Sequence, residues 1–462
     1  MVQDMTKGSV MRQIVIFTIP LFIGNLFQQA YNLVDAVVVG RFVGKDALAA
    51  VGTSFPALFL LIALVMGLTM GASVVVSQLF GAGEIEKMRR AISTTLFFLL
   101  GCALSLTVIG LLVSRKLLLL LQTPPEVLED AVIYLHITFA GLLFVFLYNT
   151  IAAFFRALGD SRTPLYFLII SSLLNIVLDL LFVLRYNMGV AGVAWATVIA
   201  QAISVVISIA YIYWRVDLLK LYLKDLVFDR KIFAEAVRLG IPAAIQQTIL
   251  SLGMVAVQGL VNSFGSVTIA AYTAAVRIDS IAMMPIMNLG MAVSTFTAQN
   301  IGAAKLARVR RGYRQTLAMV AACCVATTAI VLLYGPKLIA LFIDASEIEV
   351  IAQGNDYITV VSFFYIVMGL LFVTNGVLRG SGDMTVSMIS TIISLSARVI
   401  FAYILSSKPE IGYRGLWWSI PIGWGFGFVV AYIRYCSGKW TEKGVVRTLA
   451  GPAAETETLP PA

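Results

Sequence analysis

The sequence predicts an all-α polytopic membrane protein with twelve transmembrane helices in two pseudo-symmetric six-helix lobes. Three observations support this fold class. Hydrophobic residues make up 60% of the 462-residue chain and charged residues only 12%, which is well outside the usual composition of soluble domains. The apolar runs mostly exceed the ~18 residues that cross a bilayer as a helix. The two halves of the chain also resemble each other in sequence.

The expected spans follow from hydropathy, interrupted by glycine, proline and charged residues. They cover residues 12–39, 52–80, 92–114, 131–156, 164–186, 190–214, 236–263, 268–300, 313–334, 356–379, 384–406 and 413–435. If both ends of the chain face the cytoplasm, most Lys and Arg residues fall on the cytoplasmic side, as the positive-inside rule requires. The net charge of +9 follows from this bias, so we expect no nucleic-acid partner.

An internal duplication explains the similarity of the two halves. The aligned segments are "GASVVVSQLFGAGEIEKMRR" (71–90) with "AVSTFTAQNIGAAKLARVRR" (292–311), "RALGD" (156–160) with "RGSGD" (379–383), and Pro20 with Pro242. Each copy has six spans and therefore the same membrane orientation. This parallel repeat is typical of a two-lobed transporter that holds substrate between its lobes and alternates access by rocking.

The duplication defines the predicted domains. An N-terminal lobe covers residues 1–213, a charged cytoplasmic linker 214–231, and a C-terminal lobe 232–437. The remaining residues, 438–462, are predicted to form a disordered cytoplasmic tail, because their final stretch "GPAAETETLPPA" is polar and proline-containing.

Polar residues follow one face of the first span. Gln28, Asn32 and Asp35 recur at intervals of three and four residues, so they share a helix face that should point into a cavity. A charged side chain within a span costs ~2.5–3.5 kcal/mol or more, and is therefore a functional candidate by default. Pro20 removes one helical hydrogen bond, which makes a hinge in this helix plausible.

The fifth span carries a second polar pair, because Asn175 and Asp179 lie four residues apart on one face. Neighbouring spans supply neutral oxygens from Tyr31, Tyr134, Asn149 and Thr197. Together with Asp35, these groups could hold a proton or a small cation, which would relieve the repulsion between two close carboxylates. Oxygen ligands suit a hard ion such as Na⁺, whose ligands would be Asp35, Asn175, Asp179 and Thr197. The alternative is that these groups only hydrogen-bond helices together.

The second lobe differs at the corresponding positions. The seventh span contains Gln247 but no acid, and Arg398 aligns with Asn175. We expect Asp279 and Arg398 to form a buried ion pair, with Arg277 nearby, which serves either lobe packing or the substrate cavity. Met287 belongs to a methionine series at helical spacing on the eighth span. It either packs in the core or belongs to a pliable face for flat aromatic ligands.

At this point the sequence resembles the multidrug and toxic compound extrusion (MATE) family, and within it the MepA-like bacterial branch. The segments that carry the resemblance are "IPLFIGNLFQQAYNLVDAVVVGRFVGKDALAAVG", "SQLFGAGEIEKMRRA", "FRALGDSRTP" followed by "NIVLD", "AAYTAAVRIDS" and "AQNIGAAKLARVRRG". The resemblance covers nearly the whole chain. It implies a MATE fold of two six-helix bundles, export driven by entry of H⁺ or Na⁺, and substrates that are mostly organic cations.

The resemblance also implies roles for residues. Family members with a first-lobe cation site use an Asp on the first helix and an Asn-x-x-x-Asp motif on the fifth, which match Asp35 and Asn175 with Asp179. Tyr31, Tyr134, Asn149 and Thr197 match accessory polar positions, and Pro20 matches the bending proline. The NorM-type branch places acids on the seventh and tenth helices, where this sequence has none deep in a span. Asp279 remains the only deep carboxylate of the second lobe.

We therefore expect a monomeric antiporter, with no cofactor other than its coupling ion H⁺ or Na⁺, in the bacterial cytoplasmic membrane. Its partners would be small organic cations and the lipid bilayer. One alternative is a flippase for lipid-linked precursors, although only Arg277 and Arg398 could meet an anionic pyrophosphate within the spans. A membrane-embedded enzyme is the other alternative, but the sequence contains neither HExxH nor GxSxG.

Overall fold

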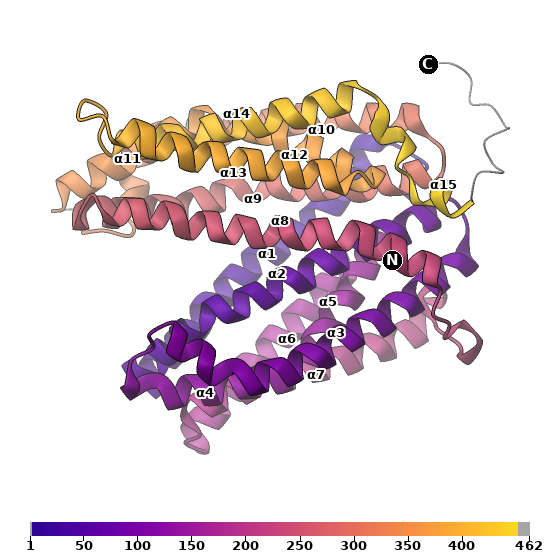
Figure 1. Cartoon of the computed structure of the whole chain (residues 1–462), viewed down its shortest axis with the longest axis horizontal. Coiled ribbons are helices and arrows are strands. Elements are labelled where there is room, and N and C mark those ends of the chain that lie inside the picture. Colours follow the sequence, from indigo (N-terminus) through magenta and orange to yellow (C-terminus); the bar gives the residue numbers. More distant parts are fainter. Residues whose placement is uncertain (1, 345, 451–462) are drawn as a thin grey trace. The chain divides into compact units, whose positions relative to one another are not determined.

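The computed structural model describes residues 2–344 and 346–450, and the regular elements among them are all helices. Those of the first half are α1 (Val10–Val38), α2 (Lys45–Gly81), α3 (Ile85–Leu120), α4 (Pro125–Ala140), α5 (Leu142–Ala157), α6 (Arg162–Leu180) and α7 (Gly189–Arg215). Those of the second half are α8 (Arg230–Asn262), α9 (Ser266–Gly302), α10 (Leu306–Ile339), α11 (Ile348–Phe363), α12 (Tyr365–Ser381), α13 (Met384–Ser406), α14 (Arg414–Cys436) and α15 (Val445–Ala450) (Figure 1).

The helices confirm the predicted all-α membrane fold. Within the described residues, ten helices are long and apolar enough to cross a membrane, and the number rises to twelve if each of two bent helix pairs is one span. The pairs are α4 with α5 and α11 with α12, and each is bent by 51°. The bends fall in the fourth predicted span of each half, so the two copies share a local irregularity as well as a sequence pattern.

The chain folds into two compact units. The first unit contains Ile23–Val76 and Glu84–Ala244 together with the extreme N-terminus, and the second contains Asp4–Phe22, Ser77–Gly83 and the chain from Ile245 onward. Helices α1 and α8 are therefore each divided between the units, a few residues after Pro20 and Pro242 respectively. A proline lacks the backbone N–H of a helical residue, so both helices lack a hydrogen bond close to the place where they change unit.

Two repeat-related glycines make reciprocal contacts within the second unit. A Cβ atom on Gly81 would lie 1.9 Å from the backbone oxygen of Gln299, and a Cβ atom on Gly302 would lie 1.9 Å from the backbone oxygen of Gln78. Gly81 aligns with Gly302, and Gln78 with Gln299, in the internal repeat. The ends of α2 and α9 therefore meet through equivalent residues, as expected for a crossing of two duplicated helices.

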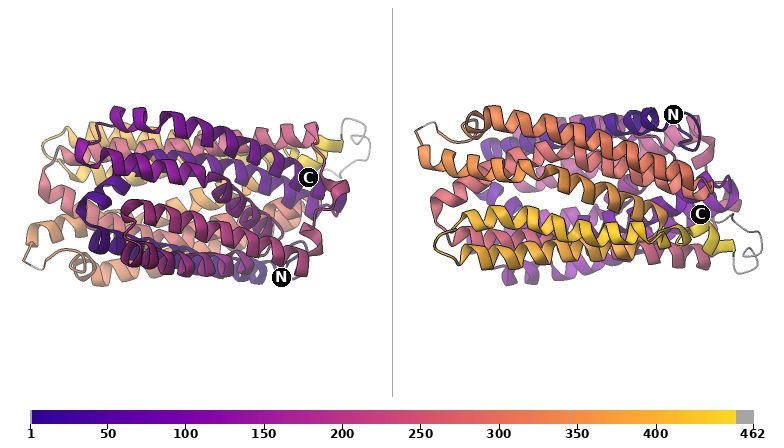
Figure 2. Two further views of the ribbon diagram at one scale, coloured as in Figure 1. Left: turned by 90° about the horizontal axis from the view of Figure 1, so that it is seen from below. Right: turned by 90° about the horizontal axis from the view of Figure 1, so that it is seen from above.

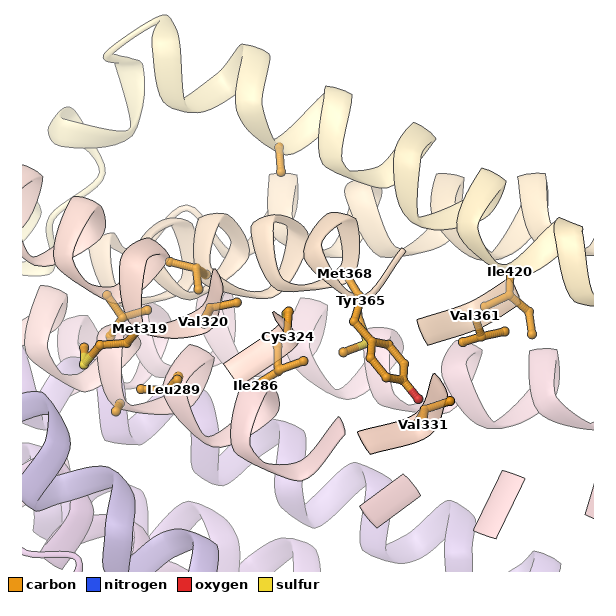
Figure 3. Close-up of a cluster of buried hydrophobic side chains, with 14 of the residues drawn as sticks. Ile286, Leu289, Met319, Val320, Cys324, Val331, Val361, Tyr365, Met368 and Ile420 are labelled. Carbon is orange, nitrogen blue, oxygen red and sulfur yellow. The ribbon is translucent and has the colours of Figure 1, made fainter. Parts of the chain in front are cut away.

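Each unit has its own apolar core. In the first unit, Val65, Leu99, Leu135 and Phe146 belong to one buried cluster from α2 to α5. In the second unit, a larger cluster joins residues of α9, α10, α11, α12 and α14, part of which Figure 3 shows around Tyr365. Helices α13 and α14 lie side by side along their length (Figures 1 and 2).

Helix α12 approaches α9 closely because it carries a Gly-x-x-x-Gly sequence. A Cβ atom on Gly376 would lie 2.4 Å from the backbone oxygen of Gly290, and one on Gly380 would lie 2.2 Å from that of Ser294. Small residues at this spacing allow membrane helices to pack backbone against backbone. This contact holds α12 against α9, the helix that carries Asp279.

The predicted disordered tail begins with ordered structure. Residues Lys439–Glu442 form a 3₁₀ turn (η5) and α15 follows it, whereas residues 451–462 lie outside the described residues. Trp440 is buried and its indole donates to the backbone oxygen of Tyr435 at 2.9 Å. The backbone N–H of Val445 donates to Gln78 Oε1 at 2.6 Å. One large aromatic side chain and one buried hydrogen bond thus order a segment whose average composition is polar.

Candidate functional site

The polar face predicted on the first span lies on the part of α1 that belongs to the first unit. Gln28 Nε2 donates to Asn32 Oδ1 at 3.2 Å, one helical turn away. Asn32 is exposed, whereas Tyr31 and Asp35 are half-buried. Gln28 is also half-buried, so of these four polar residues only Asn32 is exposed.

Three helices meet through hydrogen bonds centred on Asn175 of α6. Tyr31 Oη donates to Asn175 Oδ1 at 2.7 Å, and Asn175 Nδ2 donates to Thr197 Oγ1 of α7 at 3.3 Å. Asn175 is 2% exposed and Asp179, one turn later on α6, is 0% exposed. The structure thus brings together residues that the sequence places more than twenty residues apart.

The orientation of the Asn175 amide determines how this network ends. With its oxygen and nitrogen exchanged, the nitrogen donates to Tyr31 Oη at 2.7 Å and to Asp179 Oδ2 at 3.1 Å, and the oxygen accepts from the backbone N–H of Thr197 at 3.1 Å. This second orientation satisfies the amide more fully, and amide orientation is assigned from such networks. In both orientations Asn175 contacts Tyr31 and Thr197.

The two predicted carboxyl groups are direct neighbours. Asp35 and Asp179 lie within hydrogen-bonding reach of each other. An ionised carboxylate only accepts hydrogen bonds, so two carboxyl groups can bond to each other only when they share a proton. Oδ1 of Asp35 and Oδ1 of Asp179 are each buried with no hydrogen-bond partner. These two free oxygens are the places where a proton or a small cation would be accommodated.

A small polar pocket of about 60 Å³ adjoins the network in the first unit. Its lining includes the predicted Gln28, Tyr31, Asn175 and Thr197, and four polar residues that sequence reasoning missed, namely Tyr148, Ser171, Ser172 and Gln201. A signal for two of them was available: Ser171 precedes Asn175 by four residues, and Gln201 follows Thr197 by four. Such spacing places each of these pairs on one helix face.

Two other predicted residues differ in their relation to the carboxyl pair. Tyr134 of α4 is close enough to Asp35 and Asp179 to interact with both electrostatically. Asn149 of α5 instead donates to the backbone oxygen of Val145 at 2.8 Å, within its own helix. Tyr134 therefore belongs to the cluster, whereas the hydrogen bond of Asn149 lies within its own helix and does not reach the cluster.

Both acid-bearing helices continue into a π-helical turn. Helix α1 is followed by η1 (Val39–Val43), and α6 by η2 (Leu181–Arg185). Such turns are rare and are found frequently at functional sites. In the described part of the second unit, neither α8 nor α13, the repeat equivalents of these helices, ends in one. The first unit is therefore irregular beside its carboxyl pair, and the second unit is regular at the equivalent places.

The deep carboxylate of the second unit has different surroundings. Asp279 of α9 accepts hydrogen bonds from Tyr365 Oη at 2.7 Å and Tyr357 Oη at 3.3 Å, one on each carboxylate oxygen. Its exposed fraction is 8%. The predicted ion pair with Arg398 is wrong, because no ion pair within 4 Å joins the two side chains among the described residues. Tyrosine hydroxyls occupy both oxygens, and Arg398 acts on the carboxylate only at longer range.

The remaining candidates of the second unit do not form one cluster. Arg398 is half-buried and its Nε has no hydrogen-bond partner. Arg277 is exposed and lies over the ring of Phe342, 5.8 Å from its centre. Met287 is 45% exposed. The backbone oxygen of Gln247 accepts a hydrogen bond from Ser251 Oγ at 2.9 Å. None of these contacts reaches Asp279.

The repeat explains why the second unit lacks a carboxyl pair. With the offset that matches Pro20 to Pro242, the residue equivalent to Asp35 is Val257. With the offset that matches Asn175 to Arg398, the residue equivalent to Asp179 is Ala402. Val257 is 3% exposed and Ala402 is 1% exposed, so apolar packing replaces both acids.

Comparisons with known proteins agree with this architecture. The MatE family model matches residues 20–181 and 242–404, once in each half of the chain. "Probable multidrug resistance protein YpnP" of Bacillus subtilis is 33% identical over 95% of this chain and 97% of its own length. "Multidrug export protein MepA" of Staphylococcus haemolyticus is 24% identical over 90% of this chain and 91% of its own length.

A solved structure has the same fold. The outward-facing conformation of a multidrug resistance MATE family transporter of the MOP superfamily superposes with a TM-score of 0.87, at 26% identity, over 96% of this chain and 98% of that one. The duplicated match, the relatives and this structure confirm the family predicted from the sequence motifs. The chain therefore belongs to the MatE family and is a membrane transporter rather than an enzyme.

Proposed function

We propose that this chain is an antiporter that exports organic, mostly cationic, compounds across the cytoplasmic membrane in exchange for H⁺ or Na⁺. The observation that carries the proposal is the carboxyl pair of Asp35 and Asp179, which lies beside the Asn175 network and has two unpartnered oxygens. The names of the relatives, a probable multidrug resistance protein and a multidrug export protein, support export of drugs.

The coupling ion would bind in the first unit. A proton would bridge the two carboxyl groups and remove one negative charge. Na⁺ would instead use the oxygens of Asp35, Asp179, Asn175 and Thr197, which are the hard ligands that it prefers. Either ion reduces the negative charge that attracts a cationic drug. Ion and drug then compete, and this difference in affinity between two states is what couples their movements.

The hinge would lie near Pro20. Helix α1 carries Asp35 in the first unit, and its part before Ile23 belongs to the second unit. A change of charge at Asp35 can therefore alter the direction of α1 at the place where Pro20 leaves a helical hydrogen bond unmade. Alternating access requires two such states, and the ion must bind one of them more tightly than the other.

Drug efflux from proteoliposomes tests the proposal. The purified chain is reconstituted, ethidium is loaded inside, and its exit is followed by fluorescence under an imposed pH gradient and, separately, an imposed Na⁺ gradient. One gradient should accelerate efflux and thereby identify the coupling ion. We expect Asp35→Asn to slow the gradient-driven component by at least about tenfold, because a coupling free energy of a few kcal/mol is lost.

Asp130→Asn is the matched control. It makes the same chemical change at a half-buried residue of α4, and should leave efflux unchanged. Gradient-driven efflux by Asp35→Asn at the wild-type rate would refute the role of the carboxyl pair. Translocation of a fluorescent lipid-linked precursor without any drug efflux would favour a flippase instead.

A further inference from the structure

A basic pocket lies at the start of α10, away from the carboxyl pair. It has a volume of about 490 Å³ and is lined by Ala307, Arg310, Arg311, Arg314 and Gln315. All five residues belong to the second unit. Helix α10 is one of the helices long and apolar enough to cross a membrane. Because the pocket lies in the first turns of that helix, we expect it near the boundary between the membrane and the aqueous phase.

The three arginines of the pocket are exposed on the surface of α10. Among the described residues, none of them makes an ion pair with a carboxylate. Two basic neighbours on the same segment are used: Lys305 Nζ donates to the backbone oxygen of Thr6 at 2.9 Å, and Arg308 donates to that of Gly8 at 2.8 Å. The basic segment thus has one side that holds the N-terminal segment and another side that stays available.

The first repeat uses the equivalent position differently. Arg89, which aligns with Arg310, donates to the backbone oxygen of Asp217 at 3.0 Å and lies over the ring of Tyr222, 5.8 Å from its centre. In the first unit, Arg89 is therefore held by the segment that joins the two repeats. No described segment does the same for Arg310, so the positive charge of the second copy is left for a ligand.

The surroundings of the pocket suit a lipid. Arg310 and Arg314 act electrostatically on Tyr435 of α14, whose ring centre lies 4.2 Å from that of Tyr313 and 5.6 Å from that of Trp440. Tyr313 and Trp440 are buried, at 5% and 2% exposure, whereas Tyr435 is half-buried, so Tyr435 is the one of the three that can lie at the headgroup level where tyrosine gathers. A buried acceptor is also present, because Gln315 Oε1 has no hydrogen-bond partner.

We propose that this pocket binds the headgroup of an anionic phospholipid of the phosphatidylglycerol type. The phosphate would lie among the guanidinium groups of Arg310, Arg311 and Arg314, which match phosphate geometry. A rotation of the Gln315 side chain would bring its buried, unpartnered oxygen to a glycerol hydroxyl. Basic pockets between membrane helices bind anionic headgroups by the same physics. The positive-inside rule accounts for the sign of the charge, but it accounts neither for a concave pocket nor for a buried amide oxygen without a partner.

Native mass spectrometry of the purified, detergent-solubilised chain tests this site. Dioleoyl phosphatidylglycerol and dioleoyl phosphatidylcholine are titrated separately, and the bound fraction is read from the mass. The wild-type chain should bind the first lipid more tightly. Arg310→Gln/Arg311→Gln/Arg314→Gln should weaken it by about a hundredfold, since each basic residue near an anionic headgroup contributes roughly fivefold. The triple Arg→Lys variant keeps the charge but loses the planar guanidinium groups, and should bind more tightly than the Gln variant and more weakly than the wild type.

The control removes the same charge elsewhere on the predicted cytoplasmic side. Arg90→Gln/Arg162→Gln/Lys231→Gln changes three exposed residues near the starts of α3, α6 and α8, and should leave lipid binding unchanged. If both triple Gln variants lose the same affinity for phosphatidylglycerol, the lipid is held by bulk electrostatic attraction, and the proposed site is wrong. Wild-type binding by the Arg→Gln variant would also overturn it.

Two further measurements complete the design. Excess sn-glycerol 3-phosphate should not displace the bound lipid, and complete displacement would show a site for a soluble anion instead of a lipid. Thermal unfolding of each variant in detergent separates loss of binding from loss of folding. If the Arg→Gln variant unfolds early, the comparison of wild type with Arg→Lys still decides the question. A guanidinium site requires the lysine variant to bind phosphatidylglycerol more weakly than the wild type, whereas equal binding would mean bulk attraction and would overturn the site.

Discussion

Removal of one hydroxyl group is the sharpest test of the Asn175 network. Tyr31→Phe keeps the ring on α1 and deletes the oxygen that lies 2.7 Å from the Asn175 side chain. The loss does not depend on how the amide is oriented, because Tyr31 Oη is its partner in both orientations. The carboxyl groups of Asp35 and Asp179 remain in place, so the variant changes the support of the proposed ion site and leaves its charge unchanged.

The magnitude follows from the burial of Asn175, which is 2% exposed. A buried polar group that loses its partner costs ~1–3 kcal/mol. If the ion-bound state depends on this bond, its affinity should fall by about five- to a hundredfold, since 1.4 kcal/mol corresponds to a factor of ten. The half-saturating concentration of the coupling ion should rise by that factor, while the rate at saturating ion should change little.

The assay is ethidium efflux from proteoliposomes at graded concentrations of the coupling ion. Tyr186→Phe is the control, because Tyr186 is 64% exposed, beyond the end of α6, and makes no contact with Asn175. If Tyr31→Phe has the wild-type ion dependence, the hydrogen-bond network does not support ion binding. If only its thermal stability falls, Tyr31 has a structural role alone.

Two further predictions concern the second unit. Gly380→Ala should lower its thermal stability by about 1–3 kcal/mol, because the new methyl group would lie 2.2 Å from a backbone oxygen of α9. Gly259→Ala is the control, because no atom lies within 4 Å of its new methyl group, and it should be neutral or stabilising. Differential scanning fluorimetry compares the melting temperatures of the two variants, and an equal fall in both would contradict the prediction. Asp279→Ala should also reduce the melting temperature, since Tyr357 and Tyr365 lose their acceptor. It should leave the ion dependence of efflux intact, and a changed ion dependence would contradict an ion site confined to the first unit.

The sequence predicts the helices well because apolar length and repetition are local properties. It also predicts the pairing of Asn175 with Asp179, since a four-residue interval places both side chains on one face. The missed pocket residues Ser171 and Gln201 obey the same rule, but a hydroxyl or an amide within a span is common enough to be ignored when it carries no charge.

The ion pair between Asp279 and Arg398 failed for a different reason. The sequence predicts that both residues lie within spans, but this does not determine the direction in which each helix turns its side chains. Tyr357 and Tyr365 reach Asp279 because α11 and α12 are bent relative to each other by 51°. Tyr365 begins α12 directly after this bend. No feature of the sequence alone gives the direction in which that bend turns.

The contrast between the two carboxylate environments argues for a division of roles between the copies. Asp279 has a tyrosine hydroxyl on each oxygen, so its hydrogen-bonding needs are met without an ion. Asp35 and Asp179 each have a buried oxygen without a partner, which is costly unless some state of the protein fills it. In the role proposed above, a proton or a cation bound at this carboxyl pair in the first unit would recover that cost. A duplicated transporter can therefore place ion binding in one copy and let the other, with apolar residues at both acid positions, specialise in packing and substrate.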